Sequence, residues 1–243
     1  VGVRPSVVHT DYGAAAFDRV KRMCWHHEKP FQLTGNSMAM FEMYETISRE
    51  DVPVVLDGTG GDEVFGGYWD RYFSAAVREA RLGGDHHWLD AHEAAHRAHP
   101  FLPSASQTAP RDQEDPVDDS MKPFALALLR DTVRTAVPWR PSDGLTDTLV
   151  EDAVSGRLPE WIWHNDRNAM AFGIENRSPF LDWRLIPQMG APYDQAFRGG
   201  WNKYALRKVF DDFIPLPTQW RRQKQGFRWR PAPFIKANRA EIL

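Results

Sequence analysis

A glycine-rich stretch that contains two acids, residues 54–68, carries the residue types best suited to chemistry. Its sequence is Val-Val-Leu-Asp-Gly-Thr-Gly-Gly-Asp-Glu-Val-Phe-Gly-Gly-Tyr. The apolar run ending at Asp57 predicts a buried strand of a parallel sheet. Glycines just past a strand let backbone N–H groups approach an anion closely, because no Cβ intervenes. A helical turn that begins at Asp62 would place the loop at the positive end of a helix. Acids beside such a loop are typical of a divalent metal held by a carboxylate and phosphate oxygens. The alternative is a loop that only turns the chain.

Length and composition bound the class of protein. The chain has 243 residues, 42% of them hydrophobic and 26% charged, which is enough for one large or two small domains with a sizeable core. The net charge of −3 gives no sign of a nucleic-acid or membrane-surface partner. No apolar run approaches the length of a membrane span, and no secretory segment opens the chain. The single cysteine, Cys24, excludes an internal disulfide and favours a reducing, cytoplasmic location.

The first third of the chain has the pattern of an α/β layered domain. Residues 7–10 favour a strand, and residues 14–27 and 36–48 have apolar positions at helical spacing. The strand that ends at Asp57 and a helix over residues 69–82 follow. Strand, helix, helix, strand, glycine loop and helix in this order predict a parallel sheet covered by helices.

The middle of the chain is less informative. Five histidines lie between His86 and His99, and two of them, His92 and His96, are one helical turn apart and could share a metal. The acids and alanines around them instead favour a solvated helix face. Residues 103–120 predict an exposed loop, because they are rich in Pro, Ser, Gln and Asp. Apolar helices are predicted at residues 121–137 and 146–154.

Two further groups of chemistry-bearing residues lie in the second half. Residues 158–182 interleave charged and apolar side chains, and Pro159 suits the first turn of a helix. The charges near the Ser178-Pro179 turn predict a buried ion network, chiefly through Glu175 and Arg177. Residues 199–208 predict a turn and an amphipathic helix, and residues 221–227 form a basic cluster that ends at a glycine. Such lysines suit phosphate, although a basic run is also typical of a solvated surface.

These pieces together resemble the synthetase domain of the glutamine-dependent asparagine synthetase family. The resemblance covers roughly residues 24–68 and 158–234. It rests on the motifs Leu-Asp-Gly-x-Gly-Gly-Asp-Glu-x-Phe-Gly-Gly-Tyr, Asp-Arg-x-x-Met-Ala-x-x-x-Glu-x-Arg-x-Pro-Phe-Leu-Asp and Lys-x-Gly-Phe. It implies an α/β fold of the parallel-sheet ATP-pyrophosphatase type, which resembles the adenine nucleotide α-hydrolases, with a mostly helical C-terminal half. Residues 1–84 would complete the nucleotide-binding core, residues 85–120 would be a variable insertion, and residues 121–243 would be helical.

The resemblance also implies an activity. The family binds ATP and Mg²⁺, adenylates a carboxylate with release of pyrophosphate, and forms an amide from the acyl-adenylate. Aspartate is the expected acid, and ammonia from glutamine the expected amine, supplied by a glutaminase domain in the full-length chain. Neither a nucleic acid nor a membrane is an expected partner.

Roles for individual residues follow from the same resemblance. Asp62 matches the Mg²⁺ ligand, and Lys224 matches the lysine that neutralises pyrophosphate. Glu160 lies near an acid that assists the attacking amine, within a one-residue uncertainty of alignment. The nucleotide-binding backbone and its neighbours match residues Asp57, Gly58, Thr59, Gly60 and Gly61. A mainly architectural role is expected at Asp166, Arg167, Glu175, Arg177 and Asp182.

Departures from the family pattern leave alternatives open. Asparagine-forming members commonly carry Glu where this chain has Thr59, and a hydroxyl cannot act as a carboxylate base at neutral pH. A sugar, a peptide or a secondary-metabolite acid is therefore an alternative acceptor. The family's phosphate loop, Ser-Gly-Gly-x-Asp-Ser, is expected upstream of Val1, so the chain is expected to be an inactive internal fragment of a longer synthetase. A non-catalytic scaffold module is the alternative from another class.

Overall fold

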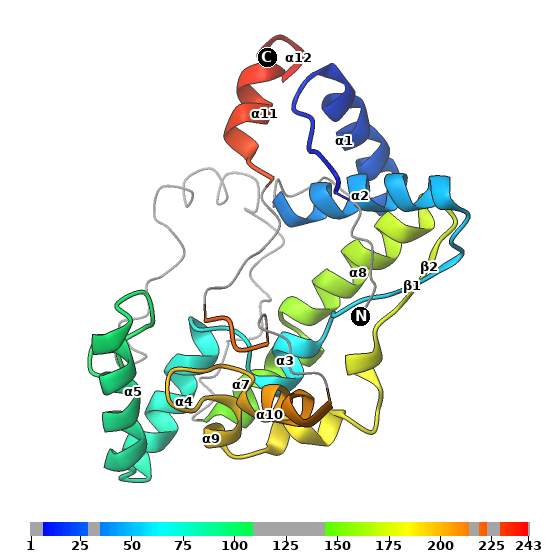
Figure 1. Cartoon of the computed structure of the whole chain (residues 1–243). Helices are drawn as coiled ribbons and strands as arrows, with labels where there is room; N and C mark the ends of the chain where they lie inside the picture. Colours follow the sequence, from blue (N-terminus) through cyan, green and yellow to red (C-terminus); the bar gives the residue numbers. More distant parts are fainter. Residues whose placement is uncertain (1–6, 29–34, 109–143, 214–218, 223–228, 243) are drawn as a thin grey trace, which may run out of the picture. The chain divides into compact units, whose positions relative to one another are not determined.

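The structure is a computed structural model, and it describes residues 7–28, 35–108, 144–213, 219–222 and 229–242. The described part is mostly helical and contains one small parallel sheet. The chain divides into two compact units, Val1–Gly61 with Asp152–Ile186 and Arg221–Leu243, and Asp62–Glu151 with Pro187–Trp220. We call them unit 1 and unit 2 and describe each by itself; Figure 1 labels the helices and strands.

The sheet of unit 1 consists of strands β1 (Val54–Leu56) and β2 (Glu175–Arg177). The strands are parallel, with Val54 opposite Glu175 and Leu56 opposite Arg177. The predicted strand is present, but it is not buried among the described residues, because Leu56 is 70% exposed there. With two strands in the described sheet, neither face of β1 is fully covered.

Three helices pack against one another in unit 1: α1 (Ala14–His27), α2 (Gly35–Ile47) and α8 (Arg157–Met170). Of these, α8 contacts β2, and Val55 of β1 packs against residues of α2. The inner residues of these helices form a core in which Met23 and Phe41 are fully buried. Helix α11 (Pro231–Ala237) closes this core with Phe234, whose ring stacks on Phe17 of α1 at a centroid distance of 6.3 Å. Side-chain burial at helical spacing explains why the sequence predicted α1 and α2 so closely.

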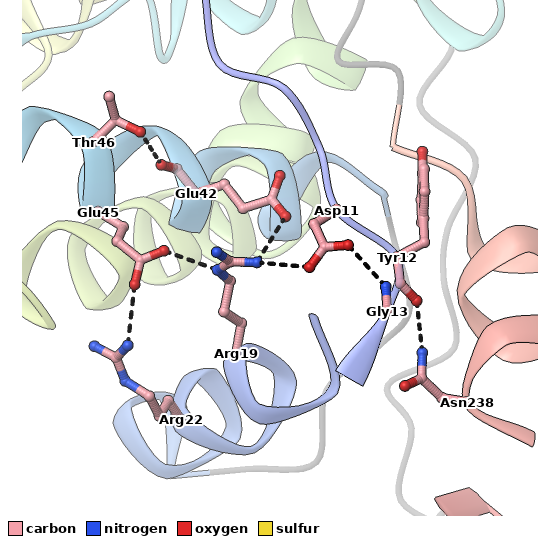
Figure 2. A network of polar contacts seen from close by, with 9 residues as sticks. All are labelled: Asp11, Tyr12, Gly13, Arg19, Arg22, Glu42, Glu45, Thr46 and Asn238. Carbon is pink, nitrogen blue, oxygen red and sulfur yellow. Dashed lines mark hydrogen bonds and ion pairs between the residues drawn. The ribbon is translucent and has the colours of Figure 1, made fainter. Parts of the chain in front are cut away.

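An ion network on α1 and α2 fixes how these two helices meet (Figure 2). Arg19 of α1 contacts Glu45 at 2.8 Å and Glu42 at 3.8 Å, both on α2, and Asp11 at 3.6 Å. Arg22 adds a second contact to Glu45 at 3.2 Å. Burial raises the pKa of the Glu42 carboxyl, and Arg19 partly offsets this effect.

Unit 2 is built on an aromatic core. Helices α4 (Arg71–Leu82) and α5 (His86–Ala98) pack side by side, each with an aspartate at its N-cap. Trp88 of α5 donates its indole N–H to the carbonyl oxygen of Phe197 at 2.8 Å.

The remaining described elements of the two units together are α3 (Gly61–Phe65), α7 (Leu145–Val154), α9 (Tyr193–Ala196), α10 (Tyr204–Phe213), α12 (Arg239–Ile242), and the 3₁₀ turns Ser48–Glu50, Pro179–Leu181 and Ile186–Gly190.

Two sequence predictions about this architecture are wrong. Residues 7–10 form no strand, and Val7 is 73% exposed. The histidine-bearing helix α5 is present, but His92 is only 2% exposed, because its ring packs on Trp88 and Phe73. The predicted helix over residues 121–137 and most of the predicted loop at 103–120 lie outside the described residues. The predicted domain boundaries at residues 84 and 120 stay predictions.

Candidate active site

Unit 1 contains a polar cluster around the carboxylate of Asp57 at the C-terminal end of β1. Its Oδ1 accepts hydrogen bonds from the backbone N–H of Thr59 at 3.1 Å and the hydroxyl of Ser178 at 2.7 Å. Its Oδ2 accepts from the Thr59 hydroxyl at 2.6 Å, from Asn176 at 3.1 Å and from the amide of Asn165. Five donors thus surround one carboxylate, and they come from the loop, from α8 and from the β2 segment.

The orientation of Asn165 is fixed from its other side. Tyr44 on α2 donates its hydroxyl to Asn165 Oδ1 at 2.7 Å, so the amide nitrogen of Asn165 faces Asp57. Burial, and then the charge of Asp57, raise the pKa of the Tyr44 hydroxyl far above its usual range. Tyr44 therefore stays a neutral donor at any physiological pH. A chain of hydrogen bonds thus connects α2 and α8 to the start of the glycine loop.

The loop that follows Asp57 leaves backbone donors available. The N–H of Gly61 donates to the carbonyl of Gly58 at 3.1 Å, which closes a tight turn. The backbone N–H groups of Gly58 and Gly60 meet no acceptor among the described residues. Gly60 has φ +87°, and a Cβ there would lie 2.2 Å from Leu181, whereas the space beside Gly58 is open. The loop therefore needs glycine at 60 and presents two backbone donors.

Helix α8 supplies a second polar group next to this cluster in unit 1. Glu160 lies in its first turn and contacts His164 one turn later, with 2.7 Å between Oε1 and Nε2. The Glu160 side chain is 43% exposed, and that of His164 only 4%. His27 of α1 packs on His164 and donates Nε2–H to Asn168, because the amide nitrogen of Asn168 is committed to Ser37. The half-exposed carboxylate of Glu160 thus contacts the buried imidazole of His164.

Unit 2, taken by itself, contains a pair of acids, Asp62 and Glu63, at the start of α3. Asp62 Oδ1 lies 2.9 Å from the Nζ of Lys203. Glu63 is buried and accepts a hydrogen bond from the Tyr68 hydroxyl at 3.0 Å. Burial raises the pKa of the Glu63 carboxyl. Asp62 is therefore the less buried acid of this pair.

The structure brings together only part of the predicted set. Residues 57–61 form one loop, Glu160 lies on α8, and Asp62 lies in unit 2, while Lys224 is outside the described residues. The predicted pair of Glu175 and Arg177 exists at 2.8 Å, but it is exposed rather than buried, because β2 has an uncovered face in the described part of the chain. Among the described residues, no group of three His, Cys, Asp or Glu side chains could hold a metal ion.

Sequence reasoning missed four participants: Asn165, Asn176, Ser178 and Lys203. A signal existed for Asn165, because His164, Asn165 and Asn168 occur at spacings that place them on the same side of a helix. A cluster of polar residues on the inward face of a helix predicts a buried hydrogen-bonded network.

Comparison with known proteins identifies the family. A model of the asparagine synthase family matches residues 7–240, a range that includes the glycine loop, α8 and the basic segment after α10. The chain belongs to the asparagine synthase family. A search of curated proteins and a search of solved structures return no significant match.

Membership of the asparagine synthase family supports an ATP-dependent amide-forming ligase in general, that is, a carbon–nitrogen ligase. The small parallel sheet and its flanking helices are consistent with the α/β synthetase fold of this family. In the described residues, no helix has the length and apolar character that crossing a membrane requires.

Proposed function

We propose that this chain is the synthetase part of a ligase that adenylates a carboxylic acid with ATP and then forms an amide. Aspartate is the acceptor acid that we propose, and ammonia from glutamine is the amine. The observation that carries this proposal is the family match over residues 7–240, which includes the glycine loop. The acid oxygen would attack the α-phosphorus of ATP, and the bond to pyrophosphate would break. The amine would then attack the acyl carbon, and AMP would leave.

The loop geometry supports binding of a nucleotide at Asp57–Gly61. Two backbone N–H groups, of Gly58 and Gly60, meet no acceptor among the described residues, and the open space beside Gly58 lets a phosphate group approach the backbone. Asp57 does not contribute charge directly to a ligand, because five donors already surround it. Its role is to fix the shape of the loop.

The residues present fit an Mg²⁺ ion that arrives with the nucleotide. Mg²⁺ is usually bound through one or two carboxylates together with substrate phosphates, so Asp62 alone is a sufficient protein ligand. When bound, the ion would neutralise charge on the phosphate oxygens. Lys224 is the residue we propose to neutralise the leaving pyrophosphate, by the same electrostatic argument.

Glu160 is the acid we propose to accept the proton of the attacking amine. Its carboxylate is half-exposed, as a group that meets a substrate must be, and the Nε2 of His164 contacts it at 2.7 Å. The contact with the buried imidazole helps to fix the orientation of this carboxylate.

A second acceptor class is favoured by the position of Thr59. The Thr59 hydroxyl donates to Asp57 at 2.6 Å, so this side chain is part of the loop scaffold and is unable to act as a base. Without a carboxylate at this position, a sugar, a peptide or a secondary-metabolite acid is the alternative to aspartate.

The test is ATP–pyrophosphate exchange by the complete gene product, with aspartate and then a panel of other carboxylic acids. Exchange that depends on aspartate supports the first proposal, and exchange with another acid supports the second. No exchange with any acid would contradict both and favour a scaffold role. Glu160→Gln should keep exchange and lose amide formation, with Glu175→Gln as the exposed control. Loss of exchange in folded Glu160→Gln would contradict the role proposed for Glu160.

A further inference from the structure

The ion pair of Asp62 and Lys203 in unit 2 has a property that the proposed function does not explain. Asp62 Oδ1 and Lys203 Nζ lie 2.9 Å apart, and the two side chains are only 24% and 26% exposed. The carboxylate that the proposal assigns to a metal ion is thus already in contact with an ammonium group. A cation and a lysine at this distance from one carboxylate would repel each other.

The backbone of Lys203 has an unusual conformation. Its φ is 50°, in the left-handed region that residues other than glycine rarely adopt. Strain of this kind persists only where surrounding contacts impose it, and it is frequent at functional sites. Here the contacts come from Asn202, whose side chain donates to the carbonyl of Gly67 and whose own carbonyl accepts from Arg207 at 2.8 Å.

The packing beside the pair leaves no room for a larger residue. A Cβ on Gly67 would lie 1.7 Å from Asp62 Oδ1 and 2.5 Å from Lys203 Cε. The backbone N–H of Gly67 also donates to the carbonyl of Asp62 at 2.7 Å. Glycine at 67 therefore lets the loop close over the two charges, so that their contact is built into the fold.

A neighbouring lysine shows the contrast. Lys208 contacts Asp211 one turn along α10 at 3.3 Å, with 56% of the lysine side chain exposed and ordinary helical backbone at both residues. Such exposed pairs contribute little and exchange freely with solvent. The Asp62–Lys203 pair differs in burial, backbone strain and packing.

We propose that Lys203 is a built-in counter-cation that keeps Asp62 from binding a metal ion until a nucleotide polyphosphate arrives. The phosphate oxygens give the ammonium group a new partner, and the freed carboxylate then becomes a metal ligand. This inference rests on the proposed function, because it takes Asp62 as the metal ligand. It adds that free metal binds weakly and that metal and nucleotide bind with positive coupling.

The test measures metal binding directly, without turnover. Mn²⁺ is titrated into the complete gene product and followed by electron paramagnetic resonance, first without nucleotide and then with a non-hydrolysable ATP analogue. Lys203→Met should bind Mn²⁺ about 5-fold more tightly than the parent without nucleotide, since a competing charge is removed. By linkage, the strengthening of Mn²⁺ binding by the analogue should fall in this variant. Lys208→Met is the matched control and should behave as the parent.

A double variant tests whether the added Mn²⁺ affinity comes from Asp62. In the double variant Lys203→Met with Asp62→Asn, the added Mn²⁺ affinity should disappear. Unchanged affinity in folded Lys203→Met, or a gain that persists in the double variant, would overturn the proposal. If Lys203→Met does not fold by circular dichroism, Lys203→Arg keeps the charge and should keep weak metal binding, and tight binding there would overturn the proposal equally.

These outcomes are separable from failure of the proposed function. Pyrophosphate exchange without the predicted Mn²⁺ behaviour would leave the ligase proposal standing and reject the role of Lys203. The predicted Mn²⁺ behaviour without exchange would do the reverse.

Discussion

The substitution Asp57→Asn tests the polar cluster of unit 1 most directly, because it keeps the shape of the side chain and removes one acceptor. If the new amide group takes the place of Oδ2, it faces the amide nitrogens of Asn165 and Asn176, and both lose their acceptor. If it takes the place of Oδ1, it faces the N–H of Thr59 and a hydroxyl that can rotate to accept. The second orientation is the less costly one.

The magnitude follows from that orientation. One unsatisfied backbone N–H costs about 1–3 kcal/mol, and each remaining hydrogen bond weakens because its acceptor is no longer charged. We therefore expect Asp57→Asn to lower the free energy of unfolding by about 3 kcal/mol. Urea unfolding followed by tryptophan fluorescence measures it, and the denaturant slope should not change.

Two comparisons make the expectation refutable. Asp182→Asn changes a partly exposed acid whose partner is the exposed Arg184, at 2.6 Å, and should cost no more than about 1 kcal/mol. Thr59→Val removes a single donor to Asp57 and should cost about 1 kcal/mol. If Asp57→Asn costs no more than these two variants, the five hydrogen bonds do not stabilise unit 1 and the reasoning fails.

Three further substitutions test other features. Gly67→Ala should lower the free energy of unfolding by about 1–3 kcal/mol, because its Cβ would clash with Asp62, whereas Gly190→Ala, with open space around it, should stay within about 0.5 kcal/mol in urea. Burial lowers the pKa of His92 from 6.5 to about 4, so between these pH values the unfolded chain binds a proton that the folded chain does not. The free energy of unfolding should therefore decrease by up to about 3 kcal/mol as the pH is lowered through this window. His92→Phe should remove this part of the pH dependence, and equal slopes in both proteins would contradict the assignment. Lys224→Ala should abolish ATP–pyrophosphate exchange, and exchange near the parent rate would reject its role.

Local sequence patterns predicted the helices well, because their apolar residues follow the helical period and their ends carry the expected signals. The bounds predicted for residues 14–27 agree with α1, and the helix predicted over residues 69–82 begins two residues later, at Arg71, after the N-cap Asp70. The strand at residues 7–10 was wrong, because a short β-favouring run forms a strand only where a neighbouring strand can pair with it. Burial was wrong at His92 and Glu175 for a related reason, since it depends on contacts with distant residues.

The candidate site residues also separate into those that the sequence indicated and those that it did not. Glycines and acids that are close in sequence could be recognised from their spacing, as could Thr59 as a departure from the family pattern. Asn165 and Asn176 reach Asp57 across 108 and 119 positions of the sequence, and no local pattern connects residues so far apart. The contact of Lys203 with Asp62 depends on a left-handed backbone at a lysine, which residue type does not indicate.

The two asparagines that donate to Asp57 Oδ2 also constrain the number of residues between them. Asn165 lies on α8, Asn176 lies on β2, and both contact the same oxygen, so the residues between them form a closed loop fastened by a single atom. Side chains within this loop can vary, but an insertion or deletion would move one asparagine out of reach or rotate it away. The segment between the two asparagines therefore tolerates substitutions but not changes of length.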